Sequence, residues 1–383
     1  MKFSFLLIVA MVICQSTWSQ VPSDSTTSAS DSSLLKQIEE QMNKNQPPPA
    51  PPQQIRSGLN FNPDIGVIGD FQGAYTSMGK RNFDLYLNET ELSLQAPVDP
   101  YLRADFFLTF GRDPVTGKYG AAVEEGYLTT LSLPARLQLK AGKFRQAVGR
   151  INSMHPHALP FIDMPNAYVN YFGEEGLNDE GISLSWLLPT KKVYQEIIFQ
   201  LTSGFSESPA FARSAGNHFL YLGHLKNFFT LTDNATLELG ITGISGPNDS
   251  ARTTNIAAAD LTYKWKPVQL NTYRSITWQS EFFYSNANMP GNTGAKNSFG
   301  LYSYLQYQLA KRWFLTGRYD YAQKPYDKSI VENGFSLTAG WYATEFSKLE
   351  VEAKATDDNI QPTYYQAWLR WIFVIGAHGA HQY

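Results

Sequence analysis

Hydrophobic and polar residues alternate along most of the chain after its N-terminal region. Over residues 102–110 nearly every second side chain is apolar, and Arg103 and Asp105 lie between them. The same alternation recurs over residues 237–242 and 349–354. A period of two places one kind of side chain on each face of a β-strand. The pattern therefore predicts strands with one apolar face and one polar face.

About sixteen such segments follow one another, with no long amphipathic helix between them. Short turns alternate with mostly longer loops, and the loop tips hold Pro, Gly, Asn and Asp. An even number of strands joined in this way is typical of bacterial outer-membrane barrels. We therefore predict an all-β fold, a transmembrane antiparallel β-barrel of about 16 strands over residues 61–383. The predicted strands start near Pro63, Phe83, Tyr101, Ala121, Arg136, Gly181, Val193, His218, Ala235, Thr254, Thr272, Ser298, Arg312, Gly334, Lys348 and Thr363.

The last predicted strand carries an aromatic pattern of its own. Every second residue from Tyr365 to Ile375 is apolar, and the terminal Tyr383 has the same parity. A final strand with aromatic side chains on its outward face is typical of the signal that outer-membrane assembly machinery binds. We therefore expect this machinery as a partner, and membrane lipid and lipopolysaccharide around the barrel.

The N-terminal region predicts export from the cytoplasm. Lys2 precedes an apolar run over residues 3–14, and small residues follow it, so we predict a signal peptide over residues 1–19. Residues 20–60 are rich in Ser and Thr, then show helical spacing, then a proline run. This composition predicts a disordered segment with a short helix and a Pro-rich linker.

Composition narrows the class of protein further. Cys14 is the only cysteine and lies in the predicted signal peptide, so we expect neither disulfides nor thiolate chemistry in the mature chain. The formal net charge of −3 gives no reason to expect nucleic acid as a partner. A hydrophobic share of 43% with 14% aromatic residues suits a barrel in which half of each strand faces lipid.

The longest irregular interval lies between the predicted strands that start near Arg136 and Gly181. It would form the third extracellular loop, and its length and aromatic content predict that it folds into the lumen as a constriction. Acids on the loop would then face bases on the wall and set a transverse field. The alternative is that these charges decorate an exposed loop. The candidate constriction residues are Lys140, Lys143, Arg145, Arg150, Asp163, Glu174 and Glu175.

Two histidines on this loop suggest a metal site. His155 and His157 are two residues apart, and neutral imidazoles at this spacing can share a cation. Asp163 and a water would supply further ligands. The alternative interpretation is a solvated polar surface.

Part of the chain resembles known porins. Residues 125–127, 137–145 and 149–150 are similar to a passage of the phosphate-selective porin O/P-like group. Residues 159–165 and 171–177 are similar to porin-like proteins often named zinc-regulated outer-membrane receptors. The resemblance implies a 16-stranded porin without a plug domain that forms a homotrimer. The chain has no evident ladder of lysines and arginines, so the resemblance does not extend to phosphate selectivity.

These features together predict an outer-membrane porin that passes small hydrophilic solutes or ions. The sequence contains neither G-x-S-x-G nor H-E-x-x-H, and we predict no catalytic residues, no enzyme activity and no cofactor. Within the enzyme class, a phospholipase-type Ser and His pair stays open, because such pairs are recognised by geometry and not by sequence motif. The main alternatives are a surface scaffold or adhesion barrel, and a gated metal-uptake receptor with a closed lumen.

Overall fold

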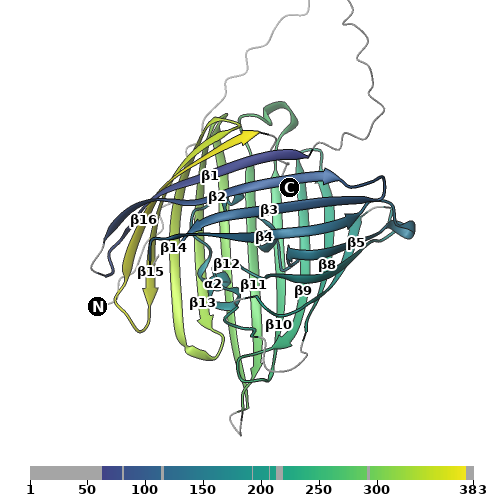
Figure 1. The fold of residues 1–383 in the computed structure, drawn as a ribbon. Coiled ribbons are helices and arrows are strands. Elements are labelled where there is room, and N and C mark those ends of the chain that lie inside the picture. Colours follow the sequence, from purple (N-terminus) through teal and green to yellow (C-terminus); the bar gives the residue numbers. More distant parts are fainter. Residues whose placement is uncertain are drawn as a thin grey trace, which may run out of the picture. The chain divides into compact units, whose positions relative to one another are not determined.

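The computed structural model describes residues 63–376, apart from 80–81, 114–115, 192, 207, 213–218 and 291–293. These residues form a closed antiparallel barrel in which neighbouring strands follow one another in sequence (Figure 1). The strands are β1 (Asp64–Thr76), β2 (Phe83–Pro97), β3 (Leu102–Arg112), β4 (Tyr119–Thr130), β5 (Leu137–Arg145), β6 (Asn178–Leu187), β7 (Tyr194–Thr202), β8 (Leu220–Thr232), β9 (Ala235–Pro247), β10 (Thr253–Trp265), β11 (Ile276–Asn288), β12 (Ala295–Ala310), β13 (Trp313–Lys324), β14 (Asp327–Thr344), β15 (Ser347–Asp358) and β16 (Tyr364–Gly376). The helical segments are η1 (Pro134–Arg136), η2 (Ile151–Ser153), η3 (Pro156–Ala158), α2 (Asn166–Phe172) and η4 (Val268–Leu270).

The barrel closes where its first strand meets its last. β1 pairs with β16 over eleven consecutive residue pairs, from Gly66 opposite Gly376 to Thr76 opposite Gln366. Closure gives every strand two hydrogen-bonded neighbours and leaves no free sheet edge. The predicted all-β barrel of about 16 strands is therefore confirmed. Among the described residues, no helix is long and apolar enough to cross a bilayer.

The two faces of the wall differ as the alternation predicts. On β16, Leu369 and Trp371 are exposed on the outer face, whereas Arg370 between them is fully buried inside. On β15, Val351 is exposed and the adjacent Glu352 is buried. Apolar side chains thus cover the outside, and charged side chains point into the lumen. The terminal Tyr383 lies outside the described residues.

The predicted strand boundaries differ most from the structure at β14. We predicted a strand that starts near Gly334, but β14 already starts at Asp327, so β13 and β14 are joined by residues 325–326 alone. Residues 327–333 are polar at both parities, apart from Ile330 and Val331, so they lack the alternation that marks a strand. Backbone pairing with β13 extends the strand nevertheless.

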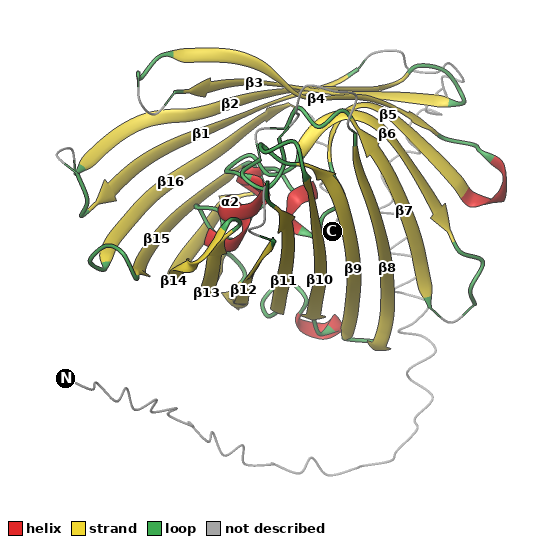
Figure 2. Ribbon diagram, turned by 90° about the horizontal axis from the view of Figure 1, so that it is seen from below, coloured by secondary structure: helices red, strands yellow, loops and turns green. Residues whose placement is uncertain are grey.

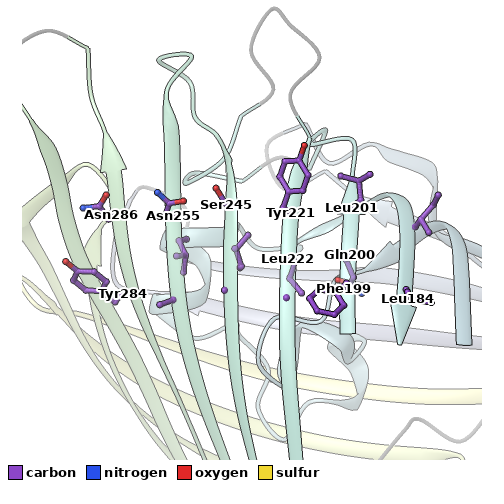
Figure 3. Close-up of a pocket in the computed structure, with 16 residues that line it drawn as sticks. Leu184, Phe199, Gln200, Leu201, Tyr221, Leu222, Ser245, Asn255, Tyr284 and Asn286 are labelled. Carbon is purple, nitrogen blue, oxygen red and sulfur yellow. The ribbon is translucent and has the colours of Figure 1, made fainter. Parts of the chain in front are cut away.

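Small residues leave an apolar groove on the outer side of β6 to β11. Gly223, Gly243 and Ala257 stand where other strands carry large side chains, and Phe199 and Tyr221 flank them. The groove encloses about 840 Å³. Its lining residues come from the six strands β6 to β11. Figure 3 shows these side chains, among them Phe199, Tyr221 and Tyr284. The outer surface is therefore apolar but uneven.

The loop over residues 146–177 lies inside the ring of strands, which confirms the predicted third loop folded into the lumen. Figure 2 shows α2 and the neighbouring loop segments enclosed by the barrel wall. The hydrophobic core of the described residues lies here, between loop and wall. The predictions for residues 1–60 fall outside the described residues, and so does His218, near which we predicted the start of a strand.

Gly142 of β5 lies at one of the closest backbone contacts of the wall. Its φ of +136° favours glycine, and an added Cβ would lie 2.2 Å from the carbonyl oxygen of Gly126 on β4. We expect Gly142→Ala to destabilise the barrel by about 1–3 kcal/mol, measured by urea unfolding in micelles. Gly317→Ala is the control, because an added Cβ there has no atom within 4 Å. Equal stability of the two variants would contradict this account.

Candidate functional site in the barrel lumen

The loop over residues 146–177 is closed at its base by one asparagine. Asn152 donates from Nδ2 to the carbonyl oxygens of Gln146 at 2.6 Å and Leu177 at 2.8 Å. Its Oδ1 accepts from the backbone N–H of Leu177 at 2.9 Å. These bonds hold the first and last residues of the loop side by side, so the loop leaves the wall and returns at one place.

Aromatic side chains pack the loop against the opposite wall. The ring centroids of Tyr168, Tyr171 and Phe172 lie 5.7, 6.2 and 5.4 Å from that of Phe283 on β11. All four rings are fully buried. Offset and edge-to-face aromatic contacts of this kind add to the burial of apolar area. Part of the lumen is therefore filled by a packed core.

Two arginines at the start of the loop meet acids of the wall. Arg145 forms an ion pair with Glu124 on β4 and donates to the carbonyl oxygen of Glu175 at 2.7 Å. Arg150 reaches Glu238 on β9 at 2.7 Å, and its backbone N–H donates to Glu281 on β11 at 2.8 Å. Arg145 is the last residue of β5 and pairs within the wall, whereas Arg150 presents a base from the loop to an acidic wall position, the reverse of the arrangement that we expected.

The two predicted lysines stay apart from this network. Lys140 lies over the ring of Tyr127, with Nζ 4.1 Å from the centroid. Lys143 donates to the backbone carbonyl of Val123 at 2.8 Å. Neither lysine forms an ion pair with Asp163, which occupies another part of the lumen.

Asp163 faces two cations of the wall, as expected of a loop acid. It pairs with Arg318 on β13 at 2.7 Å and with Lys354 on β15. Burial alone would raise the pKa of the Asp163 carboxyl, but the two cations hold this pKa below its usual range. Lys354 also donates to Asn166 at the start of α2. The pair therefore fixes the middle of the loop to β13 and β15.

Backbone carbonyls of the loop are bound by further wall cations. Arg370 on β16 donates to the carbonyl oxygens of Pro156 at 3.1 Å and Phe161 at 3.0 Å. Lys348 on β15 donates to the carbonyl oxygen of His157 at 3.2 Å. These bonds satisfy polar groups of an irregular segment that would otherwise be buried without partners.

The remaining loop acids do not face bases across the lumen. Glu174 is exposed, and the side chain of Glu175 retains 81% of its exposed area although it lies 3.6 Å from Arg145. The wall residues that hold the loop were not among the predicted site residues. They occupy inward-facing positions, which recur at every second residue of a strand, and this parity could have identified them. These residues are Glu91, Glu238, Glu281, Arg318, Lys348, Glu352, Lys354 and Arg370.

The histidine pair lies against a cluster of glutamates rather than beside Asp163. His155 Nδ1 lies 2.9 Å from Glu91, and His155 Nε2 lies 3.1 Å from Glu125. His157 Nδ1 lies 3.7 Å from Glu91. Burial alone would lower the pKa of His155, but its contacts with three glutamates hold this pKa well above the usual value for histidine.

Comparisons with known proteins agree with this fold. No family model matches the chain. In structure it is similar to the anion-selective porin from Comamonas acidovorans, with 9% identity, TM-score 0.57 and coverage of 82% of this chain and 99% of that one. It is also similar to the outer membrane channel DcaP of Acinetobacter baumannii, with 11% identity, TM-score 0.56 and coverage of 82% and 98%. At such identity these likenesses establish the fold alone.

One match in sequence is stronger. An uncharacterized protein of Aquifex aeolicus (strain VF5) is 30% identical over 348 residues, which cover 79% of this chain and 71% of that protein. The chain therefore belongs to the same family as this Aquifex aeolicus protein, and it has the fold of outer-membrane porins and channels.

Proposed function

We propose that this chain is an outer-membrane channel that passes small hydrophilic solutes or ions past a fixed, charged constriction. The observation that carries this proposal is the loop over residues 146–177, which crosses the lumen and is ion-paired to the wall. An apolar outer face and a charged inner face suit a barrel that surrounds water within lipid. The resemblance to the porin O/P-like group supports the same function, and a homotrimer stays a prediction.

The charges that remain accessible favour cations. Arg318, Lys354 and Arg370 are buried beneath the loop, with side chains no more than 4% exposed. Glu174 and Glu175 remain exposed. A passage lined by uncovered acids concentrates cations and repels anions.

The packed aromatic core supports a second candidate function. Tyr168, Tyr171 and Phe172 are fully buried within the lumen, so the loop fills space that solutes would otherwise use. On this alternative the lumen stays closed until the loop moves, as in a gated receptor. Neither function involves catalysis, and we propose no enzyme activity.

Planar-bilayer recording distinguishes the two functions. The refolded protein should give steady open channels, and its reversal potential in a salt gradient should show a preference for cations, because the loop exposes the acids Glu174 and Glu175. Replacing Glu174 and Glu175 by Gln should reduce that preference without closing the channel. A correctly folded barrel that conducts no current would overturn the open-channel proposal in favour of the gated one.

Deleting residues 154–171 tests the loop as a constriction. Asn152 and Leu177 are hydrogen-bonded, so the shortened loop can still close at its base. We expect a markedly larger single-channel conductance, because the segment that packs against the inner wall would be removed. An unchanged conductance would show that the loop does not limit the passage.

Asp163→Asn tests whether the ion pairs hold the loop in place. Loss of one partner of a buried pair costs about 3–5 kcal/mol, so chymotrypsin should cleave at Tyr168 or Tyr171 at least about tenfold faster. The pKa of Asp163 is lowered, so in the wild type this contribution should persist at pH values above about 3.9 and fade only as the pH falls further.

The control is Asp233→Asn, which changes an exposed turn between β8 and β9. Mass spectrometry of the fragments locates the cleavage sites. Equal cleavage rates within residues 146–177 for the two variants would show that Asp163 does not hold the loop.

A further inference from the structure

Side chains from the loop and from two strands converge on one side of the lumen. Ligand atoms of Glu91 on β2 and of His155 and His157 on the loop all lie within 4.8 Å of one another. Glu124 and Glu125 on β4 approach the same His155. We propose that this cluster binds one divalent first-row transition cation, for which zinc is the probe.

The donor atoms suit such a cation in kind and spacing. Glu91 lies 2.9 Å from His155 Nδ1 and 3.7 Å from His157 Nδ1. Ligand atoms of a tetrahedral zinc site are about 3.3 Å apart, a value between these two distances. Two imidazoles with a carboxylate favour zinc and its neighbours over magnesium or calcium, which prefer oxygen ligands alone.

The carboxylate of Glu125 orients the imidazole of His155 through the ring nitrogen that would not bind the cation. If Nδ1 of His155 binds the cation, Nε2 still lies 3.1 Å from Glu125. Metal-binding histidines commonly donate their second ring N–H to a carboxylate in this way. A bulge in β4, where its register against β3 shifts beside Phe107, places the consecutive Glu124 and Glu125 both in the interior.

Two buried carboxylate oxygens point independently to a missing cation. Glu91 is only 2% exposed, and its Oε1 has no hydrogen-bond partner among the described residues. Oε2 of the buried Glu124 also lacks such a partner. Oxygen atoms of Glu89, Glu91 and Glu124 lie within 4.8 Å of one another. Three carboxylates this close repel one another unless a cation or protons lie between them.

The site can exchange with solvent through its second histidine. The side chain of His157 keeps 10% of its exposed area, against 6% for His155 and 2% for Glu91. Metal binding at this place would tie the loop to β2, which is not among the strands that bind Asp163. Metal binding does not depend on the passage of solutes, so the metal site can be tested independently of the channel function.

The experiment is zinc titration of the refolded, chelator-treated full chain by calorimetry. His218, His378 and His381 are replaced by Ala in every sample, so that histidines outside the described residues do not contribute. We expect one zinc per chain, and Glu91→Gln or His157→Asn should each weaken affinity by about 10- to 100-fold or more. Cobalt should report the same site by its visible absorption bands, which the two variants should lose.

His224→Asn is the matched control, because His224 is another inward-facing histidine that contacts Thr242 rather than this cluster. The zinc affinity of this variant should equal that of the parent protein, which carries only the three replacements of His218, His378 and His381 by Ala. The migration of each unheated variant on a gel verifies that the barrel is folded. Absence of zinc binding by folded parent protein, or unchanged binding by both cluster variants, would overturn the proposal and leave protons as the cations of the cluster.

Discussion

Charge compensation inside a closed barrel is the constraint on which the rest of this structure depends. Strand alternation forces every second side chain inward, and here many of those side chains are charged. A buried charge without a partner is costly, so each one needs an opposite charge, a backbone dipole or water. The loop over residues 146–177 supplies opposite charges and backbone dipoles to the inward-facing side chains of the wall. Asp163 lies between Arg318 and Lys354, and loop carbonyls accept hydrogen bonds from Arg370 and Lys348.

The loop meets different charges on different strands of the wall. β13, β15 and β16 carry the basic residues that bind Asp163 and the loop backbone. Acids of these strands pair with two of the same cations, Asp320 with Arg318 and Glu350 with Arg370. β2 and β4 carry the glutamates that surround His155. One segment therefore brings an acid to Arg318 and Lys354 and imidazoles to the glutamates. Such complementarity gives the loop a single position, because a shift would expose several charges to the wrong partners at once.

Aromatic packing adds rigidity that ion pairs alone would not provide. Phe283 of β11 contacts three rings of the loop, and Phe161 lies beneath the guanidinium of Arg318 at 4.4 Å. Phe107, which breaks the polar parity of β3, packs against the ring of His155 at 4.8 Å. Inward aromatic residues thus mark the places where the loop touches the wall. Their position explains why the inner face of this barrel is only partly polar.

The sequence by itself determined the barrel, the outward face of each strand and the presence of a long inserted loop. These follow from local periodicity and connection length, which need no knowledge of distant contacts. Only the tertiary structure decided which charges meet. Barrel closure and the path of the loop bring Asp163 to Arg318, although the two residues are 155 positions apart in the sequence. The predicted metal site grouped Asp163 with His155 because the two are close in the sequence. In the fold, His155 contacts Glu91, Glu124 and Glu125 instead. The extent of β14 likewise depends on pairing with β13, which polar residues at both parities do not reveal.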